Sequence, residues 1–213
     1  MMKRRNRTRD NTMQDRLVWQ AASLLLAYPD DGHLDRLQTA ARLLDHVTGE
    51  PRALLGETVV GLSLRPTMEL QQEYVDTFDL HKRCSMLLTY WTAGDTRNRG
   101  AQMVEFTQTY RAAGVEIPKG EAPDHLPVVL EFAATVAPEA GRRLLAKYRV
   151  PIGVVAQALA ERRSPYAPVV AAVDATLPAL ASVDDVSRLM MSGPPMETVG
   201  LQPFQLTVPP RRR

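Results

Sequence analysis

Carboxylate and aromatic side chains are concentrated between residues 69 and 79. Glu69, Glu73 and Asp76 follow one another at spacings of four and three residues, which places them on one face of a helix. Tyr74 and Phe78 lie beside this acidic strip. The spacing fits an ordinary solvated helix face. It also fits a surface that receives an amphipathic, basic helix from a partner, and the spacing alone leaves both interpretations open.

A second cluster is the sequence Pro123-Asp124-His125-Leu126-Pro127. The two prolines restrict the backbone, and Asp124 is predicted to cap the helix that begins after it, with His125 beside it. A well-made helix start would account for this composition. A catalytic pair, with His125 as base and Asp124 as its orienting group, would need a nucleophile that the sequence does not offer.

His81 and Cys84 are the only other pair with ligand chemistry, and they stand three residues apart. Two ligands are too few for a stable zinc site, and the other histidines are scattered along the chain. A lone cysteine is more often a small buried apolar residue. We therefore predict no bound metal, and a metal-delivery protein using His81, Cys84 and His125 is the less favoured alternative.

Strong catalytic motifs are absent: there is no GxxxxGK[ST], GxGxxG, HExxH or GxSxG sequence. The sequence thus predicts a binding protein and not an enzyme. Eight of the 26 basic residues precede Asp10 or follow Pro210, so the segment between carries 18 basic and 24 acidic residues, a net charge of −6. An acidic body suits a cationic peptide partner. The acidic body argues against a nucleic-acid partner, because only the two basic ends of the chain would favour one.

The chain has a single cysteine and no apolar run near the roughly 18 residues that a spanning helix requires. Glu131 interrupts one apolar stretch and Pro29 ends another. These features predict a soluble, cytoplasmic protein without membrane insertion. At 213 residues, one domain with a sizeable core is expected.

Apolar residues recur at helical spacing, and no segment alternates with a period of two. Helices are predicted over 17–28 and 34–47, from Pro51, from Pro66 through Phe78, over 85–91, from Asp95 to a glycine cap at Gly114, from Asp124 to Ala137, after Pro138, Pro151 and Pro168, and over 184–191. The predicted fold is therefore all-α, a single compact helical bundle of about nine to eleven helices. Residues 1–12 are predicted to be a disordered basic arm, 13–191 the helical domain, and 192–213 a flexible tail rich in proline and arginine.

The sequence text of these clusters resembles the TorD-like family of molybdoenzyme chaperones, and in its details the branch that serves respiratory nitrate reductases. The matching segments are residues 74–85, 88–90, 94–97, 99–100 and 123–132, within a resemblance that covers about residues 14 to 180. The resemblance implies a helical bundle that binds the N-terminal segment and the apo form of the nitrate reductase catalytic (alpha) subunit. It also implies that the chaperone leaves once the molybdenum bis(guanine dinucleotide) cofactor is inserted, binding no cofactor stably itself.

The same resemblance suggests which side chains contact the client. The candidate residues are Glu73, Tyr74, Asp76, Phe78, Asp79, Arg83, Tyr90, Asp124, His125 and Glu131. Proteins of cofactor biosynthesis are further candidate partners. A chaperone of another molybdoenzyme, of the DMSO or TMAO reductase type, is the main alternative.

Overall fold

The structure is a computed structural model that describes residues 2–117, 120–180, 182 and 184–196, with the backbone alone for residues 2–11. In chain order the elements are α1 (Met2–Leu26), α2 (His33–Leu44), α3 (Gly49–Ser63), α4 (Thr67–Tyr74), the π-helix η1 (Val75–Asp79), the 3₁₀-helix η2 (Lys82–Cys84), α5 (Leu88–Ala93), α6 (Arg97–Ala112), α7 (Leu126–Glu131), the π-helix η3 (Phe132–Val136), α8 (Pro138–Lys147), α9 (Arg149–Glu161), α10 (Ala167–Ala175) and α11 (Asp184–Ser192). The described part contains no strand, which confirms the all-α prediction.

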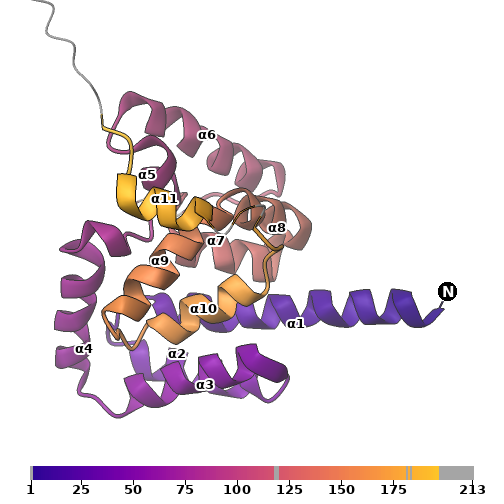
Figure 1. Ribbon diagram of the computed structural model, residues 1–213. Coiled ribbons are helices and arrows are strands. Elements are labelled where there is room, and N and C mark those ends of the chain that lie inside the picture. Colours follow the sequence, from indigo (N-terminus) through magenta and orange to yellow (C-terminus); the bar gives the residue numbers. More distant parts are fainter. Residues whose placement is uncertain (1, 118–119, 181, 183, 197–213) are drawn as a thin grey trace, which may run out of the picture.

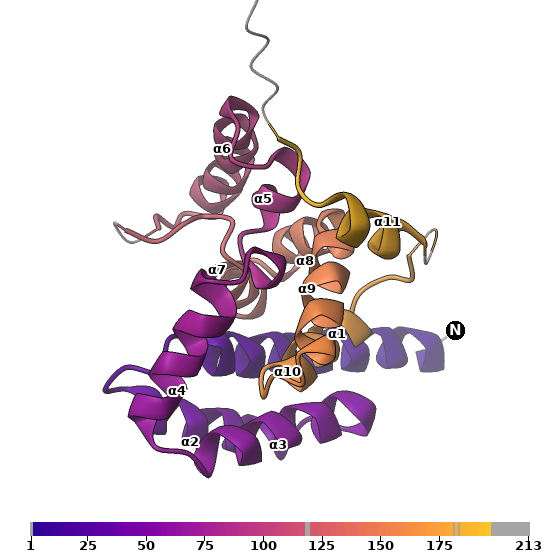
Figure 2. The same cartoon turned by 60° about the vertical axis from the view of Figure 1, so that its left-hand side comes forward.

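Helix α1 contacts helices from both the first and the second half of the chain. It packs against α2, α7, η3 and α10, and Figures 1 and 2 show α10 lying along it, with α2 and α3 nearby. Helical spacing predicts one apolar face for this helix, formed by Leu17, Ala21, Leu24, Leu25 and Tyr28. Val18, Trp19 and Ala22 lie outside that face and are fully buried, whereas Tyr28 at its end is 44% exposed. Partners on several sides bury α1 around most of its circumference, so one apolar stripe does not describe it.

The limits of the helical domain, residues 13 and 191, stay a prediction. The backbone of α1 is helical from Met2, within the segment assigned above to a basic arm. Helix α11 ends at Ser192, and residues 197–213 of the predicted tail lie outside the described residues. Among the described residues, no helix combines the length and apolar character needed to cross a lipid bilayer.

Helix α4 begins at Thr67 as predicted but changes its winding before it ends. After Tyr74 it becomes the π-helix η1, and Leu80 N donates to the carbonyl of Val75, five residues back, at 3.1 Å. Helix α7 passes into η3 in the same way. Short π-helical turns occur frequently at functional sites, because the wider turn reorients the side chains that follow.

Gly114 ends α6 as predicted, in a Schellman motif. It has a φ of +78°, Val115 N donates to Tyr110 O at 3.1 Å, and Gly114 N donates to Arg111 O at 3.0 Å. The predicted start at Asp95 is two residues early, because the helix begins at Arg97. Thr96 is the N-cap, because its hydroxyl accepts a hydrogen bond from Asn98 N at 3.2 Å.

Helix α9 ends in the same Schellman motif, but Arg163 takes the left-handed position that glycine usually occupies. Its φ is +52°, Ser164 N donates to Leu159 O, and Arg163 N donates to Ala160 O, both at 3.0 Å. A left-handed backbone costs an ordinary residue about 1 kcal/mol more than glycine. We therefore expect Arg163→Gly to raise the free energy of unfolding by about 1 kcal/mol in urea titrations. The reverse change, Gly114→Arg, should lower it by a similar amount, and a destabilised Arg163→Gly would contradict this explanation.

Candidate client-binding surface

A hollow of about 300 Å³ opens where η1 meets the loops that precede α5 and α7. Tyr74 and Phe78 contribute aromatic rings to its lining, and Asp79 and Glu121 contribute carboxylates. His125 lines it from the start of α7. We call this the acidic hollow. It brings together four of the residues proposed from the sequence, which come from two segments that are about 50 residues apart in the chain.

The two loops that line the acidic hollow are joined by backbone hydrogen bonds. Leu88 N donates to Asp124 O at 3.0 Å, and Leu126 N donates to Met86 O at 2.9 Å. These bonds form an isolated antiparallel bridge between Leu87 and His125. The bridge fixes His125 opposite the end of η1, so this side of the hollow is held by backbone contacts.

Tyr74 and Phe78 form the apolar base of the acidic hollow and belong to a cluster of four aromatic rings. Tyr74 packs against Tyr28 at 5.4 Å, Phe78 at 4.7 Å and Tyr166 at 5.8 Å between ring centroids. The Tyr74 hydroxyl donates to the carbonyl of Leu26 at 3.1 Å, and burial raises the pKa of this phenol. Edge-to-face packing of this kind favours one arrangement of the rings. The base is therefore a rigid apolar surface beneath acidic side chains.

The charge of the acidic hollow depends on His125. Burial lowers the pKa of its imidazole and outweighs Glu121, Asp124 and Asp79, which raise it. The imidazole is therefore neutral at neutral pH. The carboxylates of Asp79 and Glu121 are both exposed. At neutral pH, no positive charge on His125 offsets these two carboxylates.

Asp124 does not line the acidic hollow, because its side chain is completely buried behind it. Its Oδ2 accepts from Thr89 N at 3.1 Å and from the Thr89 hydroxyl, and Arg99 lies 3.7 Å away. The prediction that Asp124 caps the helix it precedes is thus wrong: His125 is the N-cap residue of α7. Asp124 instead caps α5, a helix 35 residues earlier in the chain.

Comparison with known protein families identifies the family of this chain. The family model described as "Nitrate reductase delta subunit" matches residues 38–172. The chain belongs to this family.

Two similar proteins are named as nitrate reductase assembly chaperones. The "Probable nitrate reductase molybdenum cofactor assembly chaperone NarJ" of Bacillus subtilis is 33% identical over 159 residues, 74% of this chain and 86% of that protein. The NarJ chaperone of Escherichia coli K12 is 28% identical over 148 residues, 68% of this chain and 63% of its own. Both are named as assembly chaperones, and together with the family match they confirm the predicted resemblance.

A longer relative is more similar in sequence. The "Nitrate reductase-like protein NarX" of Mycobacterium tuberculosis is 57% identical over 157 residues, which are 74% of this chain but 24% of that protein. The chain thus spans about a quarter of NarX.

In this member of the nitrate reductase delta subunit family, the other proposed residues lie outside the acidic hollow. Glu73 forms an ion pair with Arg65, and Asp76 is exposed on η1. Tyr90 is buried with its ring 5.7 Å from that of Trp91, while Glu131 is exposed at the end of α7. Arg83 lines a different hollow beside η2. A direct client contact by these residues stays a prediction.

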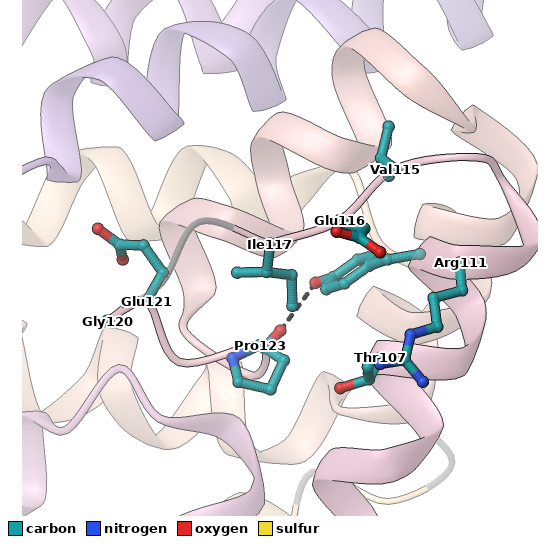
Figure 3. A pocket seen from close by; sticks show the side chains of 9 residues that line it. Thr107, Arg111, Val115, Glu116, Ile117, Gly120, Glu121 and Pro123 are labelled. Carbon is teal, nitrogen blue, oxygen red and sulfur yellow. Dashed lines mark hydrogen bonds between the residues drawn. The ribbon is translucent and has the colours of Figure 1, made fainter.

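Glu121 was not predicted from the sequence, where residues 115–123 carry only the signals of a connecting loop. It lines the acidic hollow and also an adjoining hollow of about 350 Å³ beside α6 (Figure 3). There the Tyr110 hydroxyl donates to the carbonyl of Pro123 at 2.8 Å, across from Ile117. Glu121 precedes His125 by only four residues, but the packing of this loop also brings it to the same hollow as Tyr74 and Phe78, more than 40 residues earlier in the chain, and no local pattern reports that.

Metal chemistry finds no support in the part of the chain that the structure describes. Those residues include no group of three or more His, Cys, Asp or Glu side chains that could hold a metal ion. Cys84 is fully buried, and burial raises the pKa of its thiol. The thiol therefore behaves as an apolar residue, as the interpretation of a lone cysteine expects.

Proposed function

We propose that the chain is an assembly chaperone for the catalytic (alpha) subunit of a nitrate reductase. It binds the basic N-terminal segment and the apo form of that subunit and keeps them competent for insertion of the client's molybdenum bis(guanine dinucleotide) cofactor. It is not part of the finished enzyme and acts in the cytoplasm. The observation that carries the proposal is the acidic hollow, in which aromatic rings and two carboxylates lie side by side.

The chemistry of the acidic hollow suits an amphipathic, cationic segment. Tyr74 and Phe78 offer apolar surface to one side chain, and Asp79 and Glu121 offer carboxylates to a neighbouring lysine or arginine. A segment that binds as a helix presents both kinds of side chain on one face, because positions three and four apart are neighbours. The acidic body of the chain adds long-range attraction for such a segment.

Calorimetric titration of a synthetic peptide from the N-terminus of the cognate catalytic subunit tests the proposal. We expect Asp79→Asn to weaken binding about fivefold, because one charge pair near a protein surface contributes about 1 kcal/mol. Asp76→Asn should have a smaller effect, since Asp76 is on the same π-helix but does not line the hollow. Glu57→Gln, an exposed change on α3, removes the same charge elsewhere and should leave binding unchanged.

Two further titrations vary the salt concentration and the source of the peptide. The difference between Asp79→Asn and the unchanged chain should shrink as ionic strength rises, because screening weakens exposed charge pairs. If no peptide from the catalytic subunit binds at any salt concentration, the proposal is wrong. Tighter binding of the corresponding peptide from a DMSO or TMAO reductase would assign the chaperone to that client.

A further inference from the structure

A second hollow, of about 290 Å³, opens on the other side of the segment that follows η1. It is lined by Lys82 and Arg83 of η2 and by Arg162, which follows α9. His81 and Glu161 also line it. We call this the basic hollow. It stands out because the body of the chain is otherwise acidic.

Three cations and one carboxylate, that of Glu161, line the basic hollow, so its lining has a net positive charge. Within the described part of the chain, the recorded ion pairs and hydrogen bonds of the structure include none from the side chains of Lys82, Arg83 or Arg162. Arg65 and Arg149, by contrast, are paired with carboxylates. The C-terminal end of α9 attracts a cation such as Arg162. That effect does not account for Lys82 and Arg83, which come from a different element.

The acidic and basic hollows are lined by consecutive residues of one short segment. Asp79 faces the acidic hollow and Leu80 the basic one, and Cys84 and Ser85 divide in the same way. The segment from Asp79 to Ser85 is therefore a wall that the two hollows share. Leu80 is 67% exposed where the segment passes between them. A single bound segment that crosses Leu80 would contact both.

We propose that the basic hollow is a second subsite for the same client segment and receives an acidic side chain of it. This inference rests on the proposed function and adds the chemistry of the segment: a basic, amphipathic part at the acidic hollow, and an aspartate or glutamate beside it at the basic hollow. The basic hollow is large enough to admit a carboxylate side chain, and two arginines can donate to both of its oxygens. Opposite charges at neighbouring subsites fix the direction in which the segment lies, and they disfavour segments that are uniformly basic.

The test uses the full chain and two peptides. One is the N-terminal peptide of the cognate catalytic subunit, and in the other its aspartates and glutamates are replaced by asparagine and glutamine. We expect the unchanged chain to bind the native peptide about fivefold more tightly than the neutralised one, as for one exposed charge pair. The variant Lys82→Gln/Arg83→Gln should bind both peptides alike. Arg143→Gln, an exposed change on α8 outside both hollows, should keep the difference.

Each other outcome has a defined meaning. Equal binding of both peptides by the unchanged chain, or a cognate segment without any acidic residue, overturns the second subsite and leaves the proposed function standing. Equal weakening of both peptides by Lys82→Gln/Arg83→Gln assigns the cations a nonspecific role and also overturns it. If neither peptide binds, the proposed function itself fails.

Discussion

Asp124→Ala is expected to destabilise the protein by about 3–5 kcal/mol, the usual cost of removing one partner from a buried charged pair. The side chain has no exposed surface, and its Oδ2 accepts from Thr89 N and from the Thr89 hydroxyl. Removing the carboxylate leaves both donors of Thr89 without their acceptor and leaves Arg99 beside an empty position. Because α5 then loses its cap, the loops that line the acidic hollow should loosen together.

Urea denaturation followed by circular dichroism measures this loss. Asp95→Ala is the matched control, since Asp95 also lies 3.7 Å from Arg99 but its side chain is 71% exposed. It should change the free energy of unfolding by no more than about 0.5 kcal/mol, as for other exposed pairs. Asp124→Asn keeps an oxygen that can accept from Thr89 N, so it should lose less than Asp124→Ala. Equal stability of Asp124→Ala and the unchanged chain would contradict the role assigned to this carboxylate.

Gly141→Ala is expected to lower the free energy of unfolding by about 3 kcal/mol, at the upper end of the usual cost of overpacking. Gly141 on α8 is buried against η3, and a Cβ at this position would overlap the Cα and Cβ of Ala133. The atoms in the way include backbone, so they cannot move as the end of a long side chain can. The two helices must separate, and the packing around Ala133 is lost.

Gly56→Ala on α3 is the control for the helix itself. A Cβ on Gly56 meets nothing within 4 Å, so only helix propensity changes, and we expect a gain of about 0.5–1 kcal/mol. The two variants should therefore shift the urea midpoint in opposite directions. A Gly141→Ala variant as stable as Gly56→Ala would show that α8 and η3 are not in close contact.

Much of the fold follows from local pattern, because each helix carries its own signals. Apolar residues at helical spacing located the helices, and Gly114 marked the end of α6 where its left-handed backbone is found. Asp124 was predicted to cap the helix that it precedes, and this prediction is wrong. A carboxylate near a helix start can serve any exposed backbone donor in reach, and the partner of Asp124 is Thr89 on another helix. The residues next to Asp124 in the sequence do not show which helix its carboxylate will cap.

The candidate site divides in the same way. Tyr74 and Phe78 were noticed beside an acidic helical strip and His125 between two prolines, but only the family resemblance named them, with Asp79, as client contacts. Glu121 could not be found, since residues 115–123 carry only loop signals and its place beside Tyr74 and Phe78 depends on contacts between distant parts of the chain. The sequence also did not predict that acidic and basic side chains line two separate hollows. It depends on how the chain winds after α4, and apolar spacing does not distinguish a π-turn from an α-turn.

Trp19 on α1 donates its indole N–H to the hydroxyl of Thr176, just after α10, at 2.8 Å across 157 residues of chain. During synthesis from the N-terminus, α1 is made early and α10 among the last helices. The buried side of Trp19 therefore stays uncovered while most of the domain is translated, at about 5–20 residues per second. For several seconds the newly made protein has an exposed apolar helix and is vulnerable to aggregation until its last helices fold back.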